Sequence, residues 1–227
     1  MASLKKKILG SVSGALGDVV FRERKGNNII AVRPASFKTP LDAQSVERRG
    51  KFTMATKLAR AVYVSSDLKS LWQSAAPSGT SPFNYLVKQN YFSVNSASPG
   101  SSIKMVPAGG FTFTSSEAVQ DSTGFSLTIN ALGTNNGIDT NVEVNLQVYS
   151  ILFMGSPTDD NVAPFTFLTL SSDIKPLTLD NPVTFATPLI SSQTVLYNQY
   201  SDYMTYFALV TLDSQGKVIH YSITDSI

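Results

Sequence analysis

The heptapeptide VEVNLQV, residues 142–148, is the stretch that decides the fold class. Apolar and polar residues alternate strictly along it, which is the pattern of a β-strand with one buried face. We therefore expect the valines and Leu146 to point into a core, and Glu143, Asn145 and Gln147 to point outward.

Comparable β-rich runs separated by turn clusters occur on both sides of this strand. They cover residues 105–114, 125–131, 164–171, 183–187, 193–198, 203–212 and 217–223. Seven or eight short strands are the number found in an antiparallel β-sandwich, either immunoglobulin-like or jelly-roll-like. The chain has no cysteine, so the Cys–Trp–Cys hallmark of immunoglobulin domains is missing and both topologies stay open. We expect this β-sandwich to span residues 105–227.

Residues 39–92 read as helical. Thr39 followed by Pro40 and a first-turn carboxylate predicts a helix start, with the helix continuing to about Val64. Two shorter helices are expected at 67–75 and from Ser81 onward, because their apolar residues recur at helical spacing. The Ser-rich stretch that follows predicts a linker over residues 93–104.

The first 38 residues form a basic, glycine-rich arm that contains a β-hairpin. Residues 18–24 and 29–33 alternate in the manner of strands, and a Lys-Gly-Asn-Asn turn separates them. A two-stranded ribbon is marginal by itself, so we expect the arm to be held in place by a neighbouring subunit. The overall expectation is an α+β chain.

Charge is distributed unevenly. The first 104 residues hold 16 Lys and Arg against 5 Asp and Glu, a net charge of +11, whereas the remaining residues hold 2 against 11, a net charge of −9. This asymmetry predicts association, either with nucleic acid phosphates or with the acidic half of an identical chain. A recognisable nucleic-acid module is missing from the basic half.

Catalytic motifs are not evident. The single histidine, His220, lies in the last expected strand, and no Gly-x-Ser-x-Gly elbow occurs. Gly10, Gly14 and Gly17 precede a strand instead of following one, which does not fit a Rossmann or P-loop site. The acidic stretches 139–143 and 159–161 offer calcium-type oxygens without EF-hand spacing and are interpreted as turns. We expect no cofactor, no metal site and no enzymatic activity.

The tyrosines of the acidic half leave a second interpretation open. They are Tyr149, Tyr197, Tyr200, Tyr203, Tyr206 and Tyr221. Tyrosine is enriched at interfaces and on carbohydrate-binding surfaces, and it also has ordinary strand propensity.

The first sixty residues resemble an uncharacterised group of proteins from Bacteroidota bacteria and their phage-like elements. The matching features are Gly10, Gly14, Gly17, Val19-Val20, Gly26, Arg33-Pro34, Gln44, Arg48 and Phe52. Those relatives combine a glycine-rich hairpin arm, a helical segment and a β-rich tail. The resemblance implies a structural role in a phage-like particle and no catalytic residue.

These observations predict a non-enzymatic structural subunit of a bacteriophage virion (capsid, decoration or tail-associated) that self-assembles through its basic arm. Its partners would be copies of itself and other structural proteins, and its location the virion or another extracellular assembly, with the cell surface as the alternative. No stretch is apolar enough for a membrane span. The residues expected at the assembly interface are Val20, Arg22, Arg24, Ile30, Arg33, Arg48 and Arg49. The alternatives are a surface adhesin or fibre subunit whose sandwich binds glycans, and a non-specific nucleic-acid-binding protein.

Overall fold

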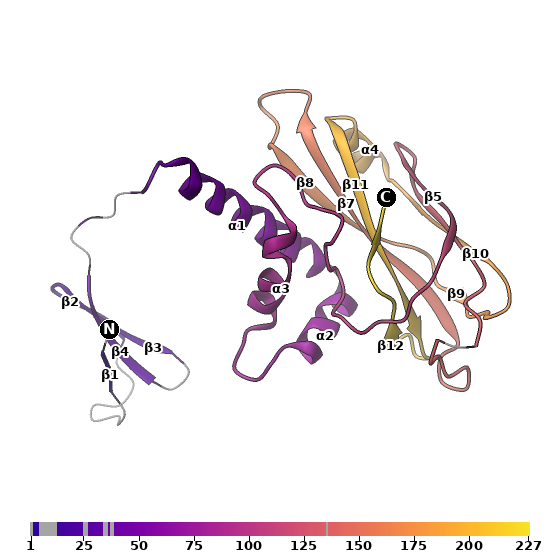
Figure 1. Ribbon diagram of the computed structural model, residues 1–227, viewed down its shortest axis with the longest axis horizontal. Coiled ribbons are helices and arrows are strands. Elements are labelled where there is room, and N and C mark those ends of the chain that lie inside the picture. Colours follow the sequence, from indigo (N-terminus) through magenta and orange to yellow (C-terminus); the bar gives the residue numbers. More distant parts are fainter. Residues whose placement is uncertain (1, 5–12, 25–26, 34–35, 37–38, 135) are drawn as a thin grey trace. The chain divides into compact units, whose positions relative to one another are not determined.

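The computed structural model describes residues 2–4, 13–24, 27–33, 36, 39–134 and 136–227 (Figure 1). The chain divides after Asp42 into an N-terminal unit, residues 1–42, and a larger unit, residues 43–227. Of the expected Lys-Gly-Asn-Asn turn, Lys25-Gly26 lies outside the described residues, and Asn27 and Asn28 belong to a strand.

The N-terminal unit is a small antiparallel sheet. Its described strands are β1 (Ala2–Leu4), β2 (Gly14–Leu16), β3 (Val19–Arg24) and β4 (Asn27–Val32), in the order β1-β4-β3-β2. The expected hairpin is β3–β4 and is confirmed. Two further strands flank it, and the tight turn between β2 and β3 uses Gly17 in the left-handed region, at φ 57°.

Helices open the larger unit. They are α1 (Ala43–Val62), α2 (Ser66–Ala75), α3 (Pro82–Asn90) and the short 3₁₀ turn η1 (Tyr91–Ser93). The backbone amide of Leu68 donates to the Ser65 hydroxyl at the start of α2, and Pro82 begins α3. The first helix starts at Ala43, three residues later than Pro40, the predicted first helical residue.

Gly50 lies in the middle of α1, where glycine is usually unfavourable. A Cβ atom at this position would come within 2.5 Å of the Cβ of Ser96. The loop after η1 therefore crosses α1 at a distance that only glycine permits.

Two antiparallel sheets follow these helices in the larger unit. In the described part of the chain the central sheet has the order β12-β11-β7-β8, with β13 on β11 and β9 on β7, and the outer sheet has the order β10-β6-β5. The central strands are β7 (Asn145–Pro157), β8 (Phe165–Ser171), β9 (Lys175–Pro176), β11 (Tyr200–Leu212), β12 (Val218–Tyr221) and β13 (Asp225–Ser226). The outer strands are β5 (Ser115–Asp121), β6 (Gly124–Ile129) and β10 (Val183–Pro188).

The larger unit is a stack of three layers. Helices α1–α3 cover one face of the central sheet, and the outer sheet covers the opposite face (Figure 1). On the helical side Trp72 and Leu58 share a core with Phe153, whereas on the other side Phe207 packs with Leu127. The helix α4 (Ser191–Tyr197) contributes to a third cluster with Leu152 and Met154.

Burial on both faces explains the apolar character of β7 and β11, which pair along their whole lengths. The helices and the sheets belong to one unit. Within residues 93–104, where a linker was expected, Val94 and Ile103 are buried in the core shared by the helices and the central sheet.

The predicted α+β architecture, with an N-terminal hairpin, short helices and an antiparallel sandwich, is confirmed. Two strand predictions are wrong. Residues 105–114 are not a strand, and the strand in this region is β5, which starts at Ser115. Residues 193–198 lie mostly in the helix α4, because the Gln193 side chain accepts a hydrogen bond from the backbone amide of Ile190 and so stabilises the helix start.

Candidate assembly surfaces

The N-terminal sheet has one apolar face. The register places Leu16 opposite Val19, Val19 opposite Val32, and Phe21 opposite Ile30, so these five side chains share a side of the sheet. Leu16 is 75% exposed and Val32 76% exposed. We call this set of five residues the apolar face.

The opposite side of the same sheet is basic. Val20 pairs with Ala31, Arg22 lies two positions further along β3, and Arg33 continues the alternation beyond β4. The backbone amide of Arg33 donates to the carbonyl of Asp18 at 2.6 Å, which fixes it beside the other end of β3. Both arginines are exposed. We call Val20, Arg22, Ala31 and Arg33 the basic face.

The residues expected at the assembly interface are therefore split. Val20, Arg22 and Arg33 lie on the basic face, and Ile30 lies on the apolar face. The reason is the two-residue period of a strand, which places Ile30 with its partner Phe21 and away from Val20. Arg24 is the last residue of β3, and its side chain lies outside the described part of the chain.

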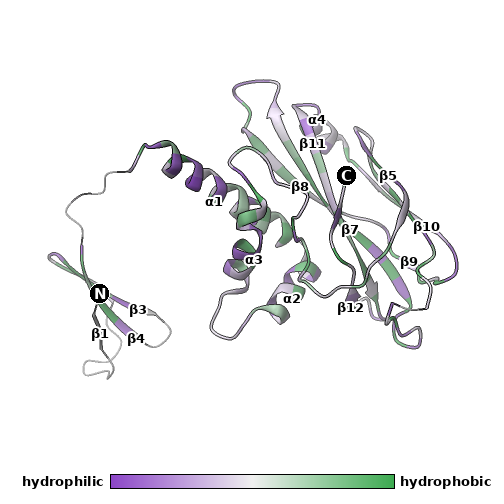
Figure 2. Cartoon of the chain, in the orientation of Figure 1, coloured by the Kyte–Doolittle hydropathy of each residue, from purple (hydrophilic) through white to green (hydrophobic). Residues whose placement is uncertain are grey.

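Arg48 and Arg49 lie in the larger unit, on the first half of α1. This half is hydrophilic (Figure 2), and both arginines are exposed. A guanidinium nitrogen of Arg48 donates to the Ser45 hydroxyl at 2.8 Å. Lys57, further along the helix, instead takes part in packing. Its amino group donates to the backbone carbonyl of Phe165 and lies 4.1 Å from the centre of the Phe165 ring.

The outer sheet turns an acidic side away from the core. Glu117, Val119 and Asp121 alternate along β5 and are exposed. They lie beside small or uncharged residues of β6 and β10, namely Gly124, Ser126, Thr128, Thr184, Ala186 and Pro188. Thr128 and Thr184 share a hydrogen bond of 3.0 Å between their hydroxyls. We call this side the acidic face.

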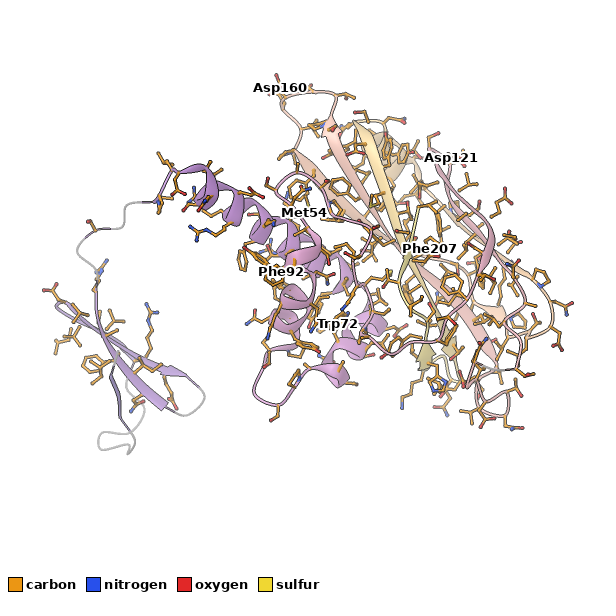
Figure 3. The ribbon with its side chains drawn as sticks, in the orientation of Figure 1. Met54, Trp72, Phe92, Asp121, Asp160 and Phe207 are labelled. Carbon is orange, nitrogen blue, oxygen red and sulfur yellow. The ribbon has the colours of Figure 1, made fainter. Side chains whose placement is uncertain are left out.

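Asp121 is held ionised at the end of the acidic face, beside the β5–β6 turn (Figure 3). The hydroxyl and then the backbone amide of Thr123 donate to its Oδ1, as does the amide of Gly124, and these bonds hold the pKa of Asp121 below its usual range. The carboxylate therefore stays negative well below neutral pH.

His220 and Glu143 belong to a hydrogen-bonded cluster that also contains Asp139 and Thr211. Glu143 is 1% exposed, and its carboxylate accepts hydrogen bonds from the Asp139 amide at 2.8 Å and from the Thr211 hydroxyl. The Nδ1 atom of His220 lies 3.0 Å from its Oε1 atom. The prediction that Glu143 points outward is wrong.

The physical reason is that β7 begins at Asn145, so residues 142–144 are not bound by the strand's alternation. Val142 is 47% exposed and Val144 39% exposed, so the prediction that these two valines point into the core is wrong, while Glu143 turns inward toward β11 and β12. The partners Thr211 and His220 are far along the chain, and no local pattern could have indicated them. The Thr211 hydroxyl donates a hydrogen bond to the same carboxylate.

The tyrosines of the sandwich do not form exposed plates. Tyr149, Tyr197, Tyr200 and Tyr206 are buried, and Tyr203 and Tyr221 are partly buried. Tyr197 and Tyr203 stack on each other, with ring centres 4.2 Å apart. The feature that pointed to glycan binding therefore contributes to packing.

The aspartates at the start of the acidic stretches 139–143 and 159–161 form hydrogen bonds that stabilise local turns. The Oδ1 atom of Asp159 accepts from the amide and the side chain of Asn161, and Asp139 makes the same pair of bonds with Asn141. Among the described residues, no three His, Asp or Glu side chains gather in a group that could hold a metal ion.

Comparison with protein-family models finds no match to this chain, and neither does comparison with curated proteins. Across the described ranges, none of the helices has both the length and the apolar content required to cross a bilayer.

Proposed function

We propose that the chain is a non-enzymatic structural subunit of a bacteriophage virion or similar assembly, joined to copies of itself through its N-terminal unit. The observation that carries the proposal is the apolar face of the N-terminal sheet. The resemblance of the first sixty residues to phage-associated proteins supports the choice of a virion.

Exposing the side chains of the apolar face to water is unfavourable in free energy. Burying one large aliphatic side chain contributes about 1.5–3 kcal/mol relative to leaving it exposed, and within the N-terminal unit Leu16 and Val32 remain largely exposed. Contiguous apolar patches on a soluble protein mark interaction surfaces. Covering this face with a second molecule would recover that free energy.

Deleting residues 1–42 tests the proposal. The larger unit has its own core, so the truncated chain is expected to fold, with its circular dichroism retained. Sedimentation velocity of the full chain is expected to show an oligomer, and the truncated chain a monomer.

A point variant tests the apolar face without removing the rest of the N-terminal unit. Val32→Glu places a charge on the apolar face at a residue that is largely exposed within its own unit, so it should reduce assembly without unfolding the sheet. Val195→Glu is the matched control, because Val195 is 63% exposed on α4 of the larger unit. A full-length chain that stays monomeric at micromolar concentration would contradict the proposal, as would equal oligomers for Val32→Glu and the wild type.

The helical segment favours one second candidate, non-specific binding of nucleic acid. Residues 43–104 hold 8 Lys and Arg against 2 Asp and Glu. Phosphate contacts weaken steeply with salt, so a gel shift with arbitrary DNA at low and high salt tests this candidate. Salt-sensitive retardation by the chain truncated to residues 43–227 would favour it.

A further inference from the structure

The basic face of the N-terminal sheet and the acidic face of the outer sheet carry complementary charges. Arg22 and Arg33 are exposed on the first, and Glu117 and Asp121 are exposed on the second. Among the residues that make up the acidic face, none is basic. The exposed carboxylate nearest the basic face belongs to Asp18, which lies beside Arg33 at the end of that face.

The spacing of these charges also matches. Glu117 and Asp121 are four positions apart on β5, with Val119 between them. Arg33 lies beside Asp18, four positions along β3 from Arg22, with the Val20–Ala31 pair between the two arginines. At about 3.4 Å per residue, both charge pairs span about 14 Å.

Each face therefore has the order charge, apolar centre, charge. Val119 is 41% exposed, and Ser126 and Ala186, its neighbours on β6 and β10, are small enough to leave the centre open. Stacked sheets pack about 10 Å apart. At that separation Val20 and Ala31 would meet Val119 and Ala186 while the arginines reach the carboxylates.

We infer that the acidic face is the surface on which the basic face of a second copy docks. The inference rests on the proposed function and adds a second contact, made by the side of the N-terminal sheet that lies opposite the apolar face. One copy presents Arg22 and Arg33, its neighbour presents Glu117 and Asp121, and the contact is heterologous, joining two different surfaces of the same chain. Exposed ion pairs contribute little by themselves, so they select the register while the apolar centre supplies affinity.

Charge reversal and its compensation test this contact in the full chain. In this contact Arg22 faces Glu117 and Arg33 faces Asp121, so Glu117→Arg places a cation opposite Arg22 and is expected to weaken self-association about tenfold. Arg22→Glu is expected to have a similar effect. The chain that carries both substitutions restores opposite charges and is expected to recover most of the lost affinity.

Asp160→Arg is the matched control, because Asp160 is an exposed carboxylate on the loop between β7 and β8, away from the β5 turn that holds Asp121 (Figure 3). Asp121 itself is left unchanged, since its side chain holds the β5–β6 turn. Sedimentation velocity at about 0.05 M and about 0.5 M salt gives the association constants. Thermal unfolding of each variant shows that it is folded.

The outcomes distinguish this inference from the proposed function. If removal of residues 1–42 abolishes assembly while Glu117→Arg assembles like Asp160→Arg, the docking site lies elsewhere and the inference is overturned, although the proposed function stands. If both reversals weaken assembly and the double variant does not recover, the two residues do not face each other, which also overturns it. A wild-type chain that is monomeric overturns both.

Discussion

The Nδ1 atom of His220 lies 3.0 Å from the Oε1 atom of Glu143, and the pair joins the segment that precedes β7 to β12. The carboxylate is enclosed, whereas half of the imidazole is exposed. A carboxylate oxygen accepts, so Nδ1 carries the proton in this contact. The imidazole, the Asp139 amide and the Thr211 hydroxyl all form hydrogen bonds with the Glu143 carboxylate. Without these partners the carboxylate would be costly to bury.

Glu143→Gln is expected to reduce the free energy of unfolding by about 2 kcal/mol, because an amide cannot accept at both positions of the carboxylate and hydrogen bonds to charged groups are the stronger ones. Urea unfolding measures the loss. His220→Asn is the control and should cost about 1 kcal/mol or less, since the imidazole is half in solvent. A larger effect at His220 than at Glu143 would contradict this account.

Alkaline pH is expected to destabilise the larger unit through Tyr149. Burial, then the hydrogen bond from its hydroxyl to Asp67 at 2.5 Å and the charge of that carboxylate, raise the pKa of Tyr149 far above its usual range. The folded protein therefore keeps this proton at a pH where the unfolded chain, with a pKa of about 10, loses it. The stabilisation is full below about pH 10 and declines as the pH rises above that value.

Tyr149→Phe removes this group and should make the fall in unfolding free energy above about pH 10 shallower. At neutral pH the same variant should lose about 1–2 kcal/mol, since the Asp67 hydrogen bond is gone. Urea unfolding over a pH series measures both effects. Identical pH dependence for the variant and the wild type would mean that other tyrosines account for the alkaline loss.

Local sequence patterns correctly predicted the helices and strands that form because of interactions between residues close in the chain. The strands β6, β8 and β10 follow β-branched and aromatic alternation, the helix α2 follows its apolar spacing, and α3 follows apolar spacing and Pro82. The prediction failed at residues 193–198, where Thr194, Val195 and Tyr197 favour a strand by propensity. There the seven residues of α4 pack beside Leu152 and Met154, and tertiary contact overrides propensity.

The surfaces were less accessible to sequence reasoning. Arg22 and Arg33 could be identified as exposed cations from the sequence. That they lie on the other side of the sheet from Ile30 follows only from the strand register. The acidic face depends on β5, a strand whose mixed residues Ser115–Asp121 carry little periodicity. Glu143 meets Thr211 and His220 only because β7 pairs with β11 and β11 with β12.

Gly124 is expected to be far less replaceable than Gly133. Both have positive φ, 147° and 68°, so alanine is strained at either position. At Gly124, however, an added Cβ would lie 2.4 Å from the Thr187 carbonyl and 2.7 Å from the Cα of Pro188, whereas at Gly133 it would meet open space. Gly133→Ala should cost about 1 kcal/mol and Gly124→Ala about 2–3 kcal/mol or more. Equal unfolding midpoints for the two variants would contradict this close approach of β6 and β10.

The helices and the sandwich are expected to unfold together. Trp72, the single tryptophan, is 1% exposed, donates from its indole nitrogen to the Met105 carbonyl at 2.9 Å, and packs in a core that contains both α1 and the central sheet. Removing the helical layer would expose Ile151, Phe153 and Val210 to water, which makes a sandwich without its helices unfavourable. Trp72 fluorescence, which reports the helical layer, and far-UV circular dichroism at the strand minimum should therefore show the same urea midpoint. The chain truncated to residues 43–227 provides the control, because it removes any separate transition of the N-terminal sheet. A fluorescence change that precedes the loss of strand signal in that truncated chain would show that the helices form a separate cooperative unit.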